Sequence, residues 1–119
     1  MRIHHLALRV ADVERSLSFY SGVLGLGQIR RQGNEQGIRA VWLKAGETIL
    51  MLERRLAGAG TDAGSGHLLA FAVDDLAGWR DRLATAGIPI EGRTEHTLYV
   101  LDPDGHRVGL SDFESDPTV

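Results

Sequence analysis

The chain has 119 residues, 43% of them apolar, which is enough for a domain with its own hydrophobic core. It contains no cysteine, so disulfide bonds, thiolate nucleophiles and thiolate metal ligands are excluded. The formal charge of −3 comes from mixed signs without a basic stripe, and the sequence lacks both an apolar N-terminal run and a span of about 18 apolar residues. These features predict a cytoplasmic protein that binds neither nucleic acid nor membrane.

The chain opens with a predicted strand, helix and three further strands. Residues 4–10 alternate between apolar and polar side chains, as in a strand with one buried face. A helix is expected next, because Asp12 is a good N-cap and apolar residues recur at helical spacing until Gly25. Extended runs at 26–31, 38–44 and 48–54, with a polar turn at 32–37, complete a βαβββ module.

The same order of elements occurs a second time. Residues 57–66 contain four glycines and no large apolar side chain, which is typical of a linker. A strand at 67–73, a helix from the N-cap Asp75 to Gly87, and short strands near Ile90 and at 97–101 follow. The turn at 102–105 precedes a last strand at 107–112, and 114–119 form a polar tail.

These elements predict an α+β fold built from a doubled unit. We expect a single domain, 1–119, with module one at 1–56, a linker at 57–66, module two at 67–113 and a tail at 114–119. Neither module alone covers both faces of its sheet. The two should therefore join into one curved eight-stranded mixed sheet whose concave cavity holds a ligand.

The doubled module and two segments, HHLALRVADVERSLSFYSGVLGL and LYVLDPDGHRVGLSD, resemble the vicinal oxygen chelate superfamily. This superfamily includes glyoxalase I, extradiol dioxygenases, fosfomycin resistance proteins and bleomycin-binding proteins. The resemblance covers nearly the whole chain. It implies a cavity often shared between the two chains of a homodimer. In catalytic members it also implies a divalent metal held by histidine and glutamate from the first and fourth strands of the modules.

Only one of the four metal-ligand positions that the resemblance implies carries a ligand residue. His5 matches the first position, whereas the other three are occupied by Leu68, Met51 and Gly109. His67 is displaced from its position by one residue, which sends its side chain to the opposite face of a strand unless a β-bulge intervenes. We therefore expect no complete metal site and no cofactor.

Two residues remain as candidates for metal binding or catalysis. His5 is interpreted as a metal ligand, as a polar anchor for a bound molecule, or as a cavity histidine bonded to backbone. Glu53 lies two residues beyond Met51 and so on the same strand face. It is a candidate substitute ligand or general base, with a solvated strand end as the alternative.

The other candidates are ligand-binding residues, each with a purely structural alternative. Arg9 and Arg107 have the parity of cavity-facing residues and suit a carboxylate or phosphate, or else a surface salt bridge. Trp42 and Tyr99 suit a planar ligand, or else core packing. Met51, together with Leu68, makes the expected pocket more apolar.

The predicted function is the binding of a small, partly aromatic or amphipathic molecule by a homodimer, for sequestration or sensing. The alternative is a divalent-metal-dependent lyase, isomerase or dioxygenase, in which His5, Glu53 and, less favoured, His67 hold Ni, Zn, Mn or Fe. A structural or interaction module with a collapsed cavity is the third possibility.

Overall fold

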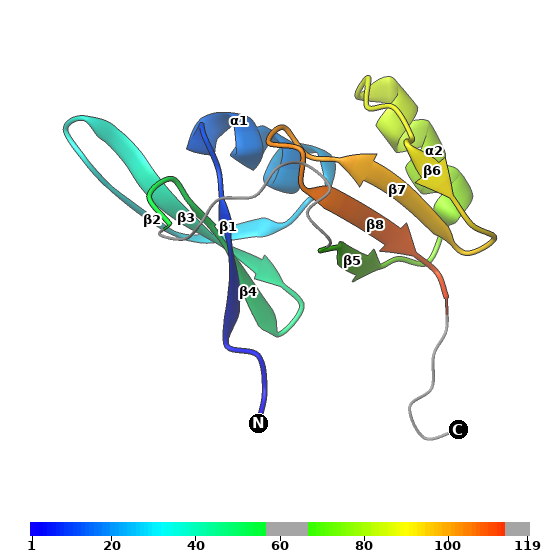
Figure 1. Cartoon of the computed structure of the whole chain (residues 1–119), viewed down its shortest axis with the longest axis horizontal. Coiled ribbons are helices and arrows are strands. Elements are labelled where there is room, and N and C mark those ends of the chain that lie inside the picture. Colours follow the sequence, from blue (N-terminus) through cyan, green and yellow to red (C-terminus); the bar gives the residue numbers. More distant parts are fainter. Residues whose placement is uncertain (57–66, 114–119) are drawn as a thin grey trace. The chain divides into compact units, whose positions relative to one another are not determined.

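The computed structural model describes residues 1–56 and 67–113, so the predicted linker and tail lie outside the described residues. The chain divides into two compact units, residues 1–60 and 61–119. Each unit contains one four-stranded mixed sheet with a helical segment (Figure 1), in the orders β1-β4-β3-β2 and β5-β8-β7-β6. The predicted α+β class and the doubled module are thus confirmed. The single domain and the joining of the sheets into one curved sheet remain predictions.

Unit one, residues 1–60, has the predicted order of elements. They are β1 (His5–Arg9), α1 (Val13–Leu17), η1 (Ser18–Val23), β2 (Gly27–Asn34), β3 (Gly37–Ala45) and β4 (Thr48–Glu53). β1 pairs in parallel with β4, and the β4–β3 and β3–β2 pairs are antiparallel. A parallel pair needs a crossover between its strands, and α1, η1 and the β2–β3 hairpin provide it.

The helical segment of unit one is not the single regular helix that the spacing predicts. Asp12 caps α1 as expected, because its carboxylate accepts a hydrogen bond of 3.2 Å from a backbone N–H in the first turn. The following segment, η1, is a π-helix, in which the Leu24 N–H donates to the Phe19 carbonyl oxygen at 3.0 Å. η1 ends at Val23, and Gly25 follows the C-cap Leu24 with a φ of 83°, in the left-handed region that favours glycine.

The β2–β3 hairpin replaces the broad polar turn predicted at 32–37. β2 continues to Asn34 and β3 begins at Gly37, so only two residues form the turn. Gly37 has a φ of 124°, and a Cβ on Gly33 would lie 2.5 Å from the Gly37 carbonyl oxygen. Both positions therefore require glycine. The prediction failed because exposed polar strands lack the apolar alternation that marks a half-buried strand.

Unit two, residues 61–119, repeats the arrangement. Its elements are β5 (Leu69–Ala72), α2 (Leu76–Thr85), β6 (Gly92–Arg93), β7 (Thr97–Leu101) and β8 (Arg107–Ser111). Asp75 caps α2 as predicted, accepting a hydrogen bond of 2.9 Å from the Gly78 N–H. β5 is shorter than expected, so His67 lies outside it. None of the helices in the described ranges has both the length and the apolar character needed to span a membrane.

Each helical segment covers one face of the sheet in its own unit. In unit one the sheet contributes Leu8, Val41, Leu43, Leu50 and Leu52, all buried, and the helical segments contribute Val13, Leu17, Phe19 and Tyr20. In unit two the buried apolar residues are Leu83 of α2 and Leu98, Val100, Val108 and Leu110 of the sheet. Alternate residues on these strands therefore occupy the other sheet face, which we call the open face of each unit.

The turn between β7 and β8 generates a prediction about stability. Asp102 is 5% exposed, and its Oδ1 accepts hydrogen bonds from the backbone N–H groups of Asp104 at 2.9 Å and His106 at 2.8 Å. Asp102→Ala should lower the free energy of unfolding by about 1–3 kcal/mol, because both donors lose their acceptor in a partly buried turn. Urea denaturation measures this change.

The matched control is Asp74→Ala, which removes an exposed carboxylate from the same unit. We expect it to change the free energy of unfolding by less than about 0.5 kcal/mol. Equal effects of the two substitutions would contradict the role assigned to Asp102.

Candidate functional site

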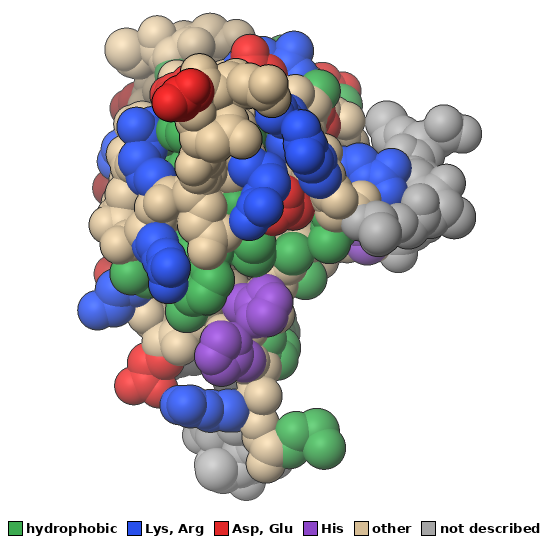
Figure 2. Space-filling view, turned by 90° about the vertical axis from the view of Figure 1, so that its left-hand side faces the viewer, with side chains coloured by type: hydrophobic (Ala, Val, Ile, Leu, Met, Phe, Trp, Pro, Cys, Tyr) green, Lys and Arg blue, Asp and Glu red, His purple; other side chains and the backbone are tan. Residues whose placement is uncertain are grey.

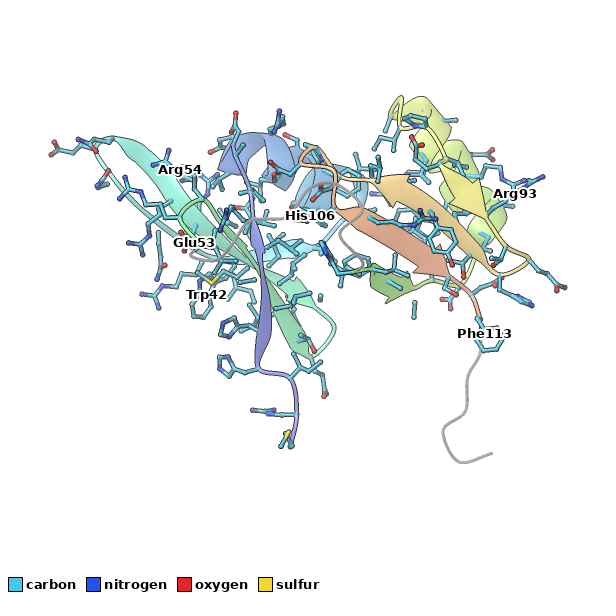
Figure 3. The ribbon with its side chains drawn as sticks, in the orientation of Figure 1. Trp42, Glu53, Arg54, Arg93, His106 and Phe113 are labelled. Atoms are coloured by element: carbon cyan, nitrogen blue, oxygen red, sulfur yellow. The ribbon has the colours of Figure 1, made fainter. Side chains whose placement is uncertain are left out.

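The open face of unit one brings together most of the residues predicted for a binding site. In the parallel β1–β4 pair, Ala7 lies opposite Met51 and Arg9 opposite Glu53, while Trp42 of β3 pairs with Met51 from the other side. These residues alternate with the buried leucines of the core, so their side chains share the open face. Trp42 and Glu53 project on the same side of the sheet in Figure 3.

His5 and Trp42 form the aromatic part of this face. Their ring centroids are 6.5 Å apart with an interplanar angle of 13°, a stacked arrangement. The Nδ1 atom of His5 lies 2.9 Å from Nδ1 of His4, and both histidines are exposed. The guanidinium group of Arg30 lies 5.7 Å from the Trp42 ring centroid, within cation–π distance.

The indole N–H of Trp42 is a donor without an acceptor. Its Nε1 atom is buried and has no hydrogen-bond partner within residues 1–56 and 67–113. Leaving such a group unsatisfied costs about 1–3 kcal/mol.

Arg9 and Glu53 lie at the other end of the open face of unit one, where backbone groups hold both side chains. The Arg9 Nε–H donates to the Leu56 carbonyl oxygen at 2.9 Å. The Glu53 Oε1 accepts from the Arg55 N–H at 3.1 Å and lies 3.9 Å from the Arg39 Nε, and the Glu53 side chain is only 12% exposed. Glu53 is thus a partly buried, ion-paired carboxylate at the end of β4, not a fully solvated strand end.

The structure does not bring His5 and Glu53 together. His5 lies opposite Ile49, and Glu53 is four residues further along β4. At a rise of about 3.3 Å per residue, the two positions are separated by about 13 Å along the sheet. The described residues contain no group of three or more His, Cys, Asp or Glu side chains placed to hold a metal ion.

The open face of unit two carries the second group of predicted residues. Gly109 of β8 pairs with Ala70 of β5 and with Tyr99 of β7. The Arg107 guanidinium group lies 4.5 Å from the Tyr99 ring centroid. Leu68, directly before β5, is 48% exposed. This face therefore consists of an aromatic ring, a cation and small or apolar groups.

His67 is not positioned in register with the strand residues of this face. It precedes β5, and its Nε2 lies 3.2 Å from Nδ1 of His106. Figure 3 shows His106 in the segment between β7 and β8. His96 lies with its Nδ1 3.0 Å from Asp112 Oδ1.

Sequence reasoning missed the contact of Arg30 with Trp42. The register of β2 against β3 shifts between Gln28 and Arg30, so counting alternate residues along β2 does not predict which side chains face Trp42. No local signal marks this irregularity, because neither glycine nor proline lies between the two positions.

The residues at the four positions implied for a divalent metal do not fit that ion. They provide one imidazole from His5 and one thioether from Met51, whereas Leu68 and Gly109 have no donor side chain. The strand register supports this assignment, since Met51 and Gly109 occupy equivalent places opposite Ala7 and Ala70. Hard divalent ions require carboxylate or imidazole ligands, about three of them in an open site.

Comparison with known proteins gives the chain a family. Residues 2–110 match the model of the Glyoxalase/Bleomycin resistance protein/Dioxygenase superfamily. A probable lactoylglutathione lyase of Vibrio cholerae is 32% identical over 123 residues, covering 92% of this chain and 88% of that protein. A lactoylglutathione lyase of Salmonella typhimurium is 31% identical over 124 residues, covering 92% and 91%.

Solved structures show the same fold. An antibiotic-binding protein from a Streptomyces species has a TM-score of 0.73 and 25% identity, covering 93% of this chain and 94% of its own. A lactoylglutathione lyase from Agrobacterium tumefaciens has a TM-score of 0.73 and 24% identity, covering 92% of each chain, which supports the fold alone. The chain belongs to the Glyoxalase/Bleomycin resistance protein/Dioxygenase superfamily.

Proposed function

We propose that this protein is a small-molecule-binding member of its superfamily that lacks the complete metal site of the catalytic members. The observation that carries the proposal is the pair of equivalent register positions, Met51 opposite Ala7 and Gly109 opposite Ala70. Neither residue supplies a ligand for a hard divalent ion. With Leu68 at a third position, the residues favour apolar and aromatic contact over metal-assisted chemistry.

The side chains of the open faces suggest what kind of molecule binds. In unit one, the stacked rings of His5 and Trp42 suit a planar or partly aromatic group. The thioether of Met51 on the same face adapts to apolar ligands of different shape. In unit two, the Tyr99 ring and the Arg107 guanidinium group, 4.5 Å apart, suit an aromatic group with an acidic substituent. The activity would be sequestration or sensing, in a homodimer such as the family resemblance implies.

Lactoylglutathione lyase activity is the second candidate, because the proteins named above from Vibrio cholerae and Salmonella typhimurium match nearly the whole chain. As a metal-dependent lyase, isomerase or dioxygenase, this protein would use His5 and Glu53 with Ni, Zn, Mn or Fe. The offset of about 13 Å between their strand positions disfavours one shared ion. The ion pair of Glu53 with Arg39 further occupies its carboxylate.

Metal analysis distinguishes the two candidates. Protein purified without chelator, then incubated with excess Ni, Zn, Mn or Fe and desalted, should retain much less than one ion per chain, because His5 alone cannot hold a hard divalent ion. Inductively coupled plasma mass spectrometry measures the ratio. The variants to compare are His5→Ala and His96→Ala, the latter removing a histidine that pairs with Asp112.

One ion per chain that is lost in His5→Ala and kept in His96→Ala would establish the metalloenzyme and overturn our proposal. Low metal content in the wild type and in both variants would support it. An assay for lactoylglutathione lyase activity on the metal-loaded protein gives an independent readout.

Titration with planar compounds tests the second part of the proposal, the binding of a small, partly aromatic molecule. We expect aromatic carboxylic acids to raise the melting temperature and to quench the fluorescence of Trp42, since a ligand that binds only the folded state stabilises it. Measuring in a Trp79→Phe background isolates the Trp42 signal, because the chain has two tryptophans. Trp42→Leu should weaken binding about tenfold, because the stacking of the indole ring on the ligand is lost.

The control is Trp79→Phe alone, which changes the tryptophan that lies 4.8 Å from the Arg82 guanidinium group on α2. Its affinity for the same compound should equal that of the wild type. If no aromatic or anionic compound shifts the melting temperature, the binding function loses its support.

A further inference from the structure

A polar hollow lies at the end of unit one, outside the residues assigned above to ligand binding. It has a volume of about 480 Å³ and is lined by the arginines of the β2–β3 hairpin and of the β4 end together with polar hairpin residues. We call it the arginine hollow; its main lining residues are Arg31, Arg39, Arg54, Arg55, Gln32 and Asn34. The volume falls in the range of small-molecule sites.

The pairing of β3 with β4 assembles this hollow. The Arg54 N–H donates to the Arg39 carbonyl oxygen at 3.0 Å, so the chain leaving β4 stays beside β3. The Arg39 guanidinium group donates to the Gln32 Oε1 at 3.3 Å across the hairpin. Residues of β2, of β3 and of the segment directly after β4 therefore line the same hollow.

Positive charge is concentrated here in a chain that is acidic as a whole. Four guanidinium groups line the hollow, whereas the chain has a formal charge of −3. Figure 2 shows basic side chains gathered on the face that it displays. Among the described residues, the carboxylate partners of these arginines are Glu14, 2.9 Å from Arg31, and Glu53, 3.9 Å from Arg39.

The two remaining arginines keep their donors available. No hydrogen bond or ion pair within residues 1–56 and 67–113 holds the guanidinium group of Arg54 or of Arg55. The neighbouring Glu53 carboxylate is engaged elsewhere, because it accepts from the Arg55 backbone N–H and lies 3.9 Å from the Arg39 Nε. Guanidinium groups bind phosphate and carboxylate oxygens in a forked geometry, which an ammonium group does not reproduce.

We propose that the arginine hollow binds a small organic anion that carries two or more phosphate or carboxylate groups. Arg54 and Arg55 would fork onto the anionic oxygens. Arg39, held by Gln32 and Glu53, would supply a fixed positive charge behind them. This site does not depend on the aromatic open face, so it stands whether or not the proposed function is correct.

Calorimetric titration with pyrophosphate tests the site, and succinate in a parallel titration distinguishes phosphate from carboxylate ligands. At an ionic strength of about 50 mM, pyrophosphate or succinate should bind with one site per chain, and added salt should weaken the affinity. Arg54→Gln and Arg55→Gln should each weaken it about tenfold, the loss expected for a charge-assisted hydrogen bond. Arg54→Lys should weaken the affinity less than Arg54→Gln does, because lysine keeps the positive charge but lacks the forked geometry of the guanidinium group.

The matched control is Arg93→Gln on β6, an exposed arginine of unit two whose loss changes the net charge equally. It should leave the affinity unchanged, and so should His5→Ala, which removes a residue of the aromatic open face. An equal loss in Arg93→Gln would show that net charge alone attracts the anion, and no binding to the wild type would overturn the site. Tighter binding of a single-stranded oligonucleotide than of pyrophosphate, at equal phosphate concentration, would also overturn it in favour of a nucleic-acid surface.

Discussion

The burial of alternate side chains against the helical segments is the constraint on which the open faces depend. Leu8 of β1 and Leu52 of β4 lie side by side in the register and are both almost fully buried. A shift of one residue in either strand would move these leucines to solvent and bring polar groups into the core. The core thereby fixes the register, and the register fixes which residues appear on the other face. The residues that determine the chemistry of each unit therefore lie on the sheet face opposite its core.

The fixed register also determines which residues occupy the positions where the family resemblance implies metal ligands. Met51 and Gly109 occupy equivalent positions in two units that share one topology, and neither position carries a carboxylate or an imidazole. Glu53 is the substitute metal ligand considered above, and it lies two residues beyond Met51 on β4. Its carboxylate already interacts with Arg39 and with the Arg55 N–H. A metal ion would have to compete with Arg39 and the Arg55 N–H for the lone pairs of the Glu53 carboxylate. Under the proposed function, the open face of unit one binds its ligand through stacking and guanidinium contacts.

Much of the fold could be predicted from the sequence because its local signals are strong and agree with one another. The aspartate caps, the glycines that end the helical segments and the apolar alternation of β1, β3 and β4 all indicate the observed elements. The end of β2 beyond residue 31 and the π-helical turn have no such signals. Both depend on pairing or packing with residues distant in sequence, and the same is true of the stacking between His5 and Trp42.

The arginine hollow could not be predicted from the sequence either, because it depends on the pairing of strands. Read along the chain, Arg54 and Arg55 resemble an ordinary solvated strand end, and Arg31 and Arg39 lie in a polar hairpin. Their convergence follows from the β3–β4 pairing and the two-residue hairpin turn, which bring the strand ends together. Charge patterning in one dimension therefore underestimates how strongly positive this region becomes in three dimensions.

The alternation between core and open face also affects how such a protein can evolve. Met51 is only partly buried, and the nearest atoms to a Cβ on Gly109 would be the Ala70 Cβ and the Thr97 Cγ2, each at 3.4 Å, close to ordinary van der Waals contact. Substitutions at these positions leave the neighbouring core leucines and valines in place, so they cost less stability than changes one residue away. Mutational drift is thus directed to the positions that determine chemistry. One scaffold can lose, regain or exchange an activity while it continues to fold.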